Sequence, residues 1–215
     1  MSERILIVSD THGRDENLEQ VVMNEAPFDM FVHCGDVEGR EIFIEALVEC
    51  PCCIVSGNND FFSDLPREEE IEIDGNKVLV THGHYYGVSM DISGVAEEAA
   101  SRDCQAVFFG HTHKPVIEKI DGVLVINPGS LSYPRQHGRR PSYVVFESEN
   151  GKNGISRAEK TEKCAKIDVI IPEKCVIAIF HETENPLIRE ESGLKIKFFL
   201  VISFLILHGI VSVLS

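Results

Sequence analysis

Phe108-Phe109-Gly110-His111-Thr112-His113 joins an apolar run to two histidines that lie two residues apart. The run from Ala106 to Phe109 predicts a buried strand. In extended backbone, positions i and i+2 point to the same side, so both imidazoles can face one site. Gly110 allows the backbone to turn there without a Cβ clash. Imidazole is the commonest protein ligand for transition metals, so this strand end is a candidate metal site.

Strands and helices alternate in the sequence before this segment. Apolar runs predict strands from Arg4 to Ser9, Phe28 to His33 and Cys53 to Ser56. Between them, apolar residues at helical spacing predict helices from Asp15 to Asn24 and from Arg40 to Cys50. This strand–helix alternation predicts a parallel sheet of the α/β class.

The pattern changes after residue 56. The remaining predicted elements are a hairpin around Asp74-Gly75 (Glu70 to Ile73 and Lys77 to Thr81), a helix from Gly94 to Asp103, a second hairpin around Asp121-Gly122 (Val116 to Ile120 and Val123 to Ile126), and a strand from Ser142 to Glu147. A parallel beginning followed by antiparallel hairpins predicts two packed sheets that are flanked by helices.

Five of the predicted strands end in a glycine beside a residue that can bind a metal. These strand ends are Ser9-Asp10-Thr11-His12-Gly13, His33-Cys34-Gly35-Asp36, Ser56-Gly57-Asn58-Asn59-Asp60, Thr81-His82-Gly83-His84 and Gly110-His111-Thr112-His113. Taken singly, each could be a helix cap, a turn or a surface loop. Taken together, they follow the rule that α/β folds gather their sites at the carboxyl ends of strands.

The series DTH, GD, GNND, HGH and GHTH resembles the calcineurin-like metallophosphoesterase superfamily. Within it, the chain is similar to the small bacterial and archaeal phosphodiesterases of the YfcE/Vps29-like branch. Asn127-Pro128-Gly129-Ser130, which follows a predicted strand, also matches that branch. The resemblance covers about residues 3–147. It implies a four-layer α/β/β/α sandwich of two mixed sheets with two metal ions at the strand ends.

The resemblance also implies a ligand set. One ion would be bound by Asp10, His12 and His113, the other by Asn58, His82 and His111, with Asp36 bridging the two. An anionic bridge makes sense because it offsets the repulsion between two cations roughly 3.5–4 Å apart. Nitrogen and oxygen ligands without thiolate suit divalent Mn²⁺, which we expect first, and also Ni²⁺, Fe²⁺ or Zn²⁺.

The expected reaction is hydrolysis of a phosphodiester. A water held between the two cations becomes hydroxide near neutral pH and attacks phosphorus in line. Asp36 and Asn58 are predicted to be catalytic because they would hold these cations. Phosphatases of the wider superfamily carry a histidine after the motif asparagine, proposed to protonate the leaving group, but this chain has Asn59 there. His84 is the candidate that could supply the missing acid, while Asn59 and Arg135 are candidate substrate-binding residues.

Two other functions stay open. The only feature against a phosphomonoesterase (phosphatase) function is the missing acid at residue 59. A non-catalytic interaction scaffold of the same fold is opposed by the complete set of seven ligand positions. The aromatic residues Phe61, Phe62, Tyr85 and Tyr86 follow ligand motifs and could stack on an aryl group or nucleobase, or pack between subunits of a homo-oligomer.

The amino-acid composition limits which partners the protein can bind and indicates the cellular compartment in which it works. The net charge is −15, and 27 of the 35 acidic residues lie in the first 150 positions. An acidic surface repels a nucleic-acid backbone, so we do not expect stable nucleic-acid binding. We expect instead a small phosphodiester or phosphorylated substrate. The seven cysteines have no disulfide-scaffold spacing, and the chain opens into a strand rather than a signal peptide. These features predict a cytoplasmic protein with reduced thiols.

We expect a catalytic domain over residues 1–149 and a divergent tail over residues 150–215. The tail contains two predicted strands, Ile167 to Ile171 and Cys175 to Phe180, and ends in an apolar stretch at 198–215. A helix of that length would measure about 27 Å, barely enough for a bilayer core. The stretch could be a membrane anchor, an extra buried element, or the product of a frameshift or gene-model error.

Overall fold

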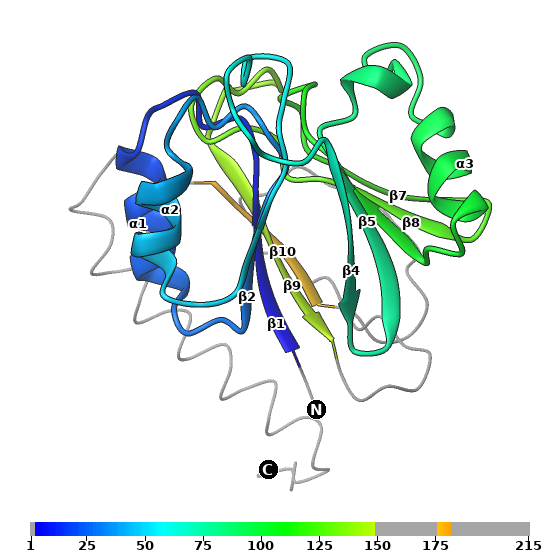
Figure 1. Cartoon of the computed structure of the whole chain (residues 1–215), viewed down its shortest axis with the longest axis horizontal. Coiled ribbons are helices and arrows are strands. Elements are labelled where there is room, and N and C mark those ends of the chain that lie inside the picture. Colours follow the sequence, from blue (N-terminus) through cyan, green and yellow to red (C-terminus); the bar gives the residue numbers. More distant parts are fainter. Residues whose placement is uncertain (1–2, 149–175, 182–215) are drawn as a thin grey trace, which may run out of the picture. The chain divides into compact units, whose positions relative to one another are not determined.

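The computed structural model describes residues 3–148 and 176–181, which form two five-stranded sheets and the helices that cover them (Figure 1). The first sheet has the order β10-β9-β1-β2-β3. Its strands are β1 (Glu3–Val8), β2 (Met30–His33), β3 (Cys52–Ile54), β9 (Ser142–Ser148) and β10 (Val176–His181). β1, β2 and β3 run parallel, and β9 is antiparallel to both of its neighbours.

The second sheet has the order β4-β5-β6-β8-β7. Its strands are β4 (Glu68–Ile73), β5 (Asn76–Thr81), β6 (Ala106–Phe108), β7 (Val116–Ile120) and β8 (Val123–Asn127). The three central strands are parallel, and β4 and β7 are antiparallel edges. Both predicted hairpins are present, and the positive φ angles of Asp74 (48°) and Gly75 (77°) give the first the left-handed backbone that a two-residue turn requires.

The helices form the two outer layers. α1 (Glu16–Glu25) and α2 (Glu41–Val48) pack on the outer face of the first sheet, and α3 (Ser93–Ser101) packs on the outer face of the second. Figure 1 shows α1 and α2 on one side of the two sheets and α3 on the other. A separate apolar core, which includes Ile5, Val78 and Phe108, lies between the sheets. This arrangement confirms the predicted four-layer α/β/β/α architecture.

The C-terminal part of the chain contributes one described strand. β10 falls on the strand predicted from Cys175 to Phe180, and it pairs with β9 along six residues of the first sheet. This segment of the predicted tail therefore belongs to the first sheet. The other tail predictions, the strand at 167–171 and the helix at 198–215, lie outside the described residues. Within residues 3–148 and 176–181, no helix is long and apolar enough to cross a membrane.

The carboxyl ends of the parallel strands in both sheets meet at one edge of the sandwich. The loops after β1 and β2 are joined there by a hydrogen bond of 3.1 Å, in which the Asp10 N–H donates to the Gly35 carbonyl. The loops after β5 and β6 are joined by the bond from the Gly110 N–H to the His82 carbonyl, 3.2 Å. All five motifs found in the sequence consequently lie at this edge.

Candidate metal centre

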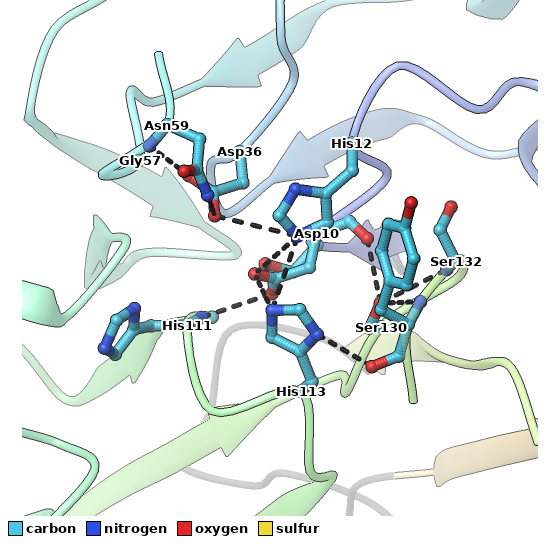
Figure 2. Close-up of polar contacts among 12 residues, drawn as sticks. Asp10, His12, Asp36, Gly57, Asn59, His111, His113, Ser130 and Ser132 are labelled. Carbon is cyan, nitrogen blue, oxygen red and sulfur yellow. Dashed lines mark hydrogen bonds and ion pairs between the residues drawn. The ribbon is translucent and has the colours of Figure 1, made fainter. Parts of the chain in front are cut away.

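Four of the predicted ligands form a first group, which we call group 1: Asp10, His12, Asp36 and His113. One potential ligand atom from each lies within 4.8 Å of all the others. His113 Nε2 is 3.1 Å from Asp10 Oδ1, and His12 Nε2 is 3.7 Å from Asp36 Oδ2 (Figure 2). Two ligands about 2.1 Å from one ion and at right angles to each other are about 3 Å apart, so this spacing fits a shared cation.

The remaining predicted ligands form group 2 around Asn58. Its Oδ1 is 2.7 Å from His111 Nδ1 and 3.1 Å from His82 Nε2. His82 Nε2 lies 3.5 Å from Asp36 Oδ2, the same oxygen that approaches His12 in group 1. The structure therefore brings all seven predicted ligand residues together, and one carboxylate oxygen of Asp36 is common to both groups.

The second ring nitrogen of three histidines is occupied by an acceptor outside the groups. His12 Nδ1 contacts Glu38 Oε1, His82 Nδ1 contacts the Cys34 carbonyl, and His113 Nδ1 contacts the Tyr133 carbonyl, each at 2.7 Å. Nδ1 must donate a proton to a carbonyl, so in the neutral ring Nε2 of His82 and of His113 has a lone pair that faces the site. Such partners fix the tautomer and orientation of metal-binding histidines.

Asp10 offers a buried oxygen without a hydrogen bond. Its Oδ2 accepts from Ser9 Oγ at 2.5 Å and from the His111 N–H at 3.2 Å, whereas Oδ1, which lies 3.1 Å from His113 Nε2, accepts no hydrogen bond of good geometry from the described residues. Burial raises the pKa of Asp10, but the imidazoles of His113 and His82 outweigh it, and the pKa lies below its ordinary value. An ionised carboxylate with an unsatisfied oxygen inside the protein fits a cation.

The backbone at the site is strained. The φ angles of Asp10, His12, Asp36, His111 and His113 are 55°, 48°, 59°, 65° and 57°. Residues other than glycine rarely adopt this left-handed conformation, and each such position costs on the order of 1–3 kcal/mol. Strain concentrated on ligand residues, in loops that aim their side chains at one point, indicates a functional constraint.

Glycines allow the loops to approach one another closely. A Cβ atom on Gly110 would lie 2.0 Å from Ser9 Oγ, and one on Gly57 would lie 2.1 Å from Asp36 Oδ1. The sequence suggested that Gly110 permits a turn, but the positive φ falls on His111 instead. Gly110 is required because the loop after β1 passes directly against it.

Asp60 and Asn59 hold the shared carboxylate in place. Asp60 accepts hydrogen bonds from the backbone N–H groups of Asp36, Val37, Glu38 and Gly57. The Asn59 N–H donates to Asp36 Oδ1 at 2.8 Å, and Asn59 Nδ2 donates to Asp36 Oδ2 at 2.7 Å. The role of Asp60 was missed from the sequence, although this aspartate ends a quoted motif.

His84 and Arg135 lie beside the two groups. The His84 ring is 5.3 Å from the His82 ring and 6.1 Å from the His111 ring, and its buried Nδ1 has no hydrogen-bond partner among the described residues. Burial and the neighbouring imidazoles lower the pKa of His84. Arg135 is exposed, and its backbone N–H donates to the His113 carbonyl.

The motif Asn127-Pro128-Gly129-Ser130 braces the loops that carry the ligands. Ser130 Oγ donates to the Asp10 carbonyl at 2.8 Å and accepts from the Tyr133 N–H (Figure 2). Asn127 Nδ2 donates to the Gly110 carbonyl at 2.6 Å. Sequence reasoning found this motif but gave it no structural role.

No cysteine belongs to the group of potential metal ligands found among residues 3–148 and 176–181. Cys50, Cys52 and Cys53 are free, and the spacing of Cys50 and Cys53 formally matches C-x-x-C, which the sequence reasoning overlooked. Burial raises the pKa of all three thiols, that of Cys53 most, so they disfavour the thiolate that binds metals.

The family follows from comparison with known proteins. Residues 4–151 match the calcineurin-like phosphoesterase superfamily domain. The chain is 37% identical over 149 residues to the probable metallophosphoesterase YsnB of Bacillus subtilis, covering 68% of this chain and 85% of that protein. It is 32% identical to the phosphodiesterase MJ0936 of Methanocaldococcus jannaschii, covering 59% and 82%. A predicted phosphoesterase of Streptococcus pneumoniae has a similar crystal structure, with a TM-score of 0.62 and 27% identity over 69% of this chain and 84% of that one.

The chain therefore belongs to the calcineurin-like phosphoesterase superfamily, as its motifs indicated. Its relatives identify it as a hydrolase that acts on phosphoester bonds. The group Asp10, His12, Asp36 and His113 is its possible metal site.

Proposed function

We propose that the protein is a cytoplasmic phosphodiesterase whose groups 1 and 2 each bind one divalent cation, with Mn²⁺ as the expected ion. The observation that carries this proposal is the position of Asp36 Oδ2, 3.7 Å from His12 Nε2 and 3.5 Å from His82 Nε2. A single oxygen within reach of both groups can bridge two cations and offset their repulsion. The small diester substrate would bind beside this carboxylate, at the two cations.

Three residues near the two groups, Asn59, His84 and Arg135, have proposed roles in the reaction. Two cations in such a site supply Lewis-acid polarisation of the phosphoryl oxygens and lower the pKa of a water positioned for in-line attack. Asn59 orients Asp36 through its two hydrogen bonds, so it does not occupy the acid's role. For assistance to the leaving group we propose His84, whose ring lies 5.3 Å from that of His82 in group 2, and for contact with a phosphoryl oxygen we propose the exposed Arg135.

The number of bound ions tests this proposal. Protein stripped of metal with a chelator is titrated with Mn²⁺, and the bound metal is measured by calorimetry and by elemental analysis. We expect two ions per chain in the parent, and one each in His113→Ala and His111→Ala, which remove a ligand from group 1 and group 2 respectively. Lys119→Ala, which changes an exposed residue on β7, should still bind two. A parent protein that binds a single ion would contradict the dinuclear proposal.

A further inference from the structure

The basic residues of this acidic protein are divided into two sets. Four basic residues of the described region 3–148 are ion-paired with carboxylates: Arg4, Arg40, Lys77 and Arg102. The others have no carboxylate within ion-pair distance among the described residues, and they are Arg14, Arg67, Lys114, Lys119, Arg135, Arg139 and Arg140. All seven side chains belong to exposed residues.

Six of these seven unpaired cations lie in loops that connect strands at the edge of the sandwich that carries the metal centre. Arg14 follows the motif after β1, and Lys114 directly follows His113. Arg67 directly precedes Glu68, which pairs with Thr81 at the end of β5, so it is placed at the same edge. Lys119, on the edge strand β7, is the exception. Positive charge without a carboxylate partner is therefore concentrated at the edge where an anionic substrate would bind.

Two of these arginines lie over exposed tyrosine rings, one beside each group. The Arg14 guanidinium is 4.5 Å from the centre of the Tyr133 ring, and that ring is 5.1 Å from His12 of group 1. The Arg67 guanidinium is 5.1 Å from the centre of the Tyr85 ring. The Tyr133 ring thus lies next to His12, whose Nε2 is 3.7 Å from Asp36 Oδ2.

The Arg67–Tyr85 pair is connected to group 2 through a histidine. The Tyr85 ring is 4.0 Å from the His84 ring, which in turn lies 5.3 Å from the ring of His82. Tyr85 is 62% exposed and Tyr133 is 44% exposed, so neither ring is used in a core. One exposed ring is therefore connected to each of the two ligand groups at which a phosphate would bind.

We propose that these two pairs are subsites for the two ester groups of the substrate, and that the substrate is a diester of two nucleosides. This inference rests on the proposed phosphodiesterase function and names its substrate class. A nucleobase stacks on tyrosine rings and on guanidinium planes, whichever base it is. The same guanidinium keeps its N–H groups free of carboxylates, so it can contact a phosphate oxygen.

The charge distribution sets the length of the substrate. A nucleic-acid strand would extend beyond the six cations onto a surface that carries a strong excess of carboxylates, which repels a polyanion. A dinucleotide has only two nucleosides, one for each tyrosine, and does not extend onto that surface. The site therefore selects a short diester.

Binding of a slowly hydrolysed analogue tests the two subsites. A dithymidine phosphorothioate is titrated into the Mn²⁺-loaded full chain by calorimetry. We expect Tyr85→Ala and Tyr133→Ala each to raise the Kd by about 5- to 100-fold, which is the usual value of one stacked base. Tyr85→Phe and Tyr133→Phe should restore binding because they keep the ring. Lys119→Ala is the matched control and should bind like the parent.

Three results would overturn the inference. The first is a Kd that neither alanine variant changes. The second is affinity that rises with the length of an oligothymidine phosphorothioate. The third is a change in molecular mass of Tyr85→Ala in sedimentation, which would place this ring at an interface between copies of the chain.

A kinetic comparison separates this inference from the proposed function. Thymidine 5′-p-nitrophenyl phosphate and methyl p-nitrophenyl phosphate share a leaving group and differ only in the retained ester group. We expect a lower KM for the thymidine ester, and a reduced preference for it in one of the two tyrosine variants. Equal KM values would reject the subsites and leave the phosphodiesterase standing. If neither ester is hydrolysed with any divalent metal, the phosphodiesterase proposal fails, and the binding experiment still decides the subsites.

Discussion

Asn59 stands where related phosphatases carry their proposed acid, and its side chain is fully committed to Asp36. The amide donates to Asp36 Oδ2 and the backbone N–H donates to Oδ1, so the residue positions a carboxylate and cannot protonate a leaving group. General acid catalysis typically contributes about 10²–10⁴-fold to a rate. We propose that any such contribution here comes from the ring N–H of His84, which lies beside the rings of His82 and His111.

His84→Ala should make the reaction more sensitive to the leaving group. We expect little change for esters of p-nitrophenol, which departs without a proton, and a loss that grows toward 10²-fold or more for esters of poorly acidic phenols. The measurement is kcat/KM for a series of aryl methyl phosphates in both proteins. If the two plots against leaving-group pKa are parallel, His84 is not the acid.

His33 gives the stability a specific pH dependence. It is buried, its Nδ1 accepts from the Gly35 N–H, and its Nε2 lies 3.0 Å from Thr11 Oγ1. Burial lowers its pKa from 6.5 to about 4. Between these two values the unfolded chain binds a proton that the folded chain does not, so the stability falls as the pH is lowered from about 6.5 to 4, by about 3 kcal/mol.

Denaturation in urea at pH 7 and pH 4.5, with chelator present, checks this prediction in the parent and in His33→Gln. The variant should be less stable at pH 7 but should lose less stability on acidification. His84, His111 and His113 titrate in both proteins, so the difference between them reports His33. An equal loss in both would show that His33 does not carry the effect.

The places of the candidate ligand residues were predictable because each residue lies in a short motif at the end of an apolar strand, whereas their division between two ions rests on the family resemblance. Asp36 and His113 can be read from the printed sequence in this way. The supporting contacts of Asp60 and Glu38 could not, because an acceptor for four backbone N–H groups or for one imidazole is defined only when distant loops are assembled. The strained φ angles, likewise, follow from the assembled loops rather than from local propensity.

At the scale of elements, the loops after β1 and β6 fit together only with a glycine between them. Gly110→Ala would place a Cβ 2.0 Å from Ser9 Oγ and 2.9 Å from Asp10 Oδ2. We expect it to lower the free energy of unfolding by about 1–3 kcal/mol and to weaken Mn²⁺ binding, because Asp10 and His111 must shift. Urea denaturation and metal titration measure the two effects.

Gly94→Ala is the matched control for this substitution. Gly94 lies in α3, where an added Cβ would be 3.4 Å from the nearest atom, the Tyr86 carbonyl oxygen. Because alanine favours a helix more than glycine does, the variant should be as stable as the parent or more stable by up to about 1 kcal/mol. A Gly110 variant that behaves like the Gly94 variant would show that the close approach is not required.

Periodicity predicted the strands and the three α-helices to within about two residues in most cases. It did not predict the 3₁₀-helix η1 (His84–Tyr86), which is a single turn between the left-handed glycines Gly83 and Gly87. Three residues are too few for a periodic signal. The pairing of β10 with β9 was also not predicted, because strand partners that lie far apart in the sequence are chosen by the assembled sheet.

At the scale of the whole molecule, the boundary of the catalytic domain depends on β10. β9 is paired with β1 on one side and with β10 on the other, so a chain that ends at residue 149 would expose one edge of β9. An exposed edge lowers stability and favours aggregation. We expect a chain of residues 1–181 to keep the Tm and activity of the parent, and a chain of residues 1–149 to melt at a lower temperature. Equal Tm values for the two truncations would place the boundary at 149.

The central claim is that one carboxylate couples two metal ions in a phosphodiesterase. The most direct measurement is the hydrolysis of bis-p-nitrophenyl phosphate and of p-nitrophenyl phosphate, with Mn²⁺, by the parent and by Asp36→Asn. This substitution keeps the shape of the side chain and removes its charge. We predict that the parent prefers the diester and that Asp36→Asn loses this activity while remaining folded. Preference for the monoester would make the protein a phosphatase, and full diester activity in Asp36→Asn would contradict the bridging role of Asp36.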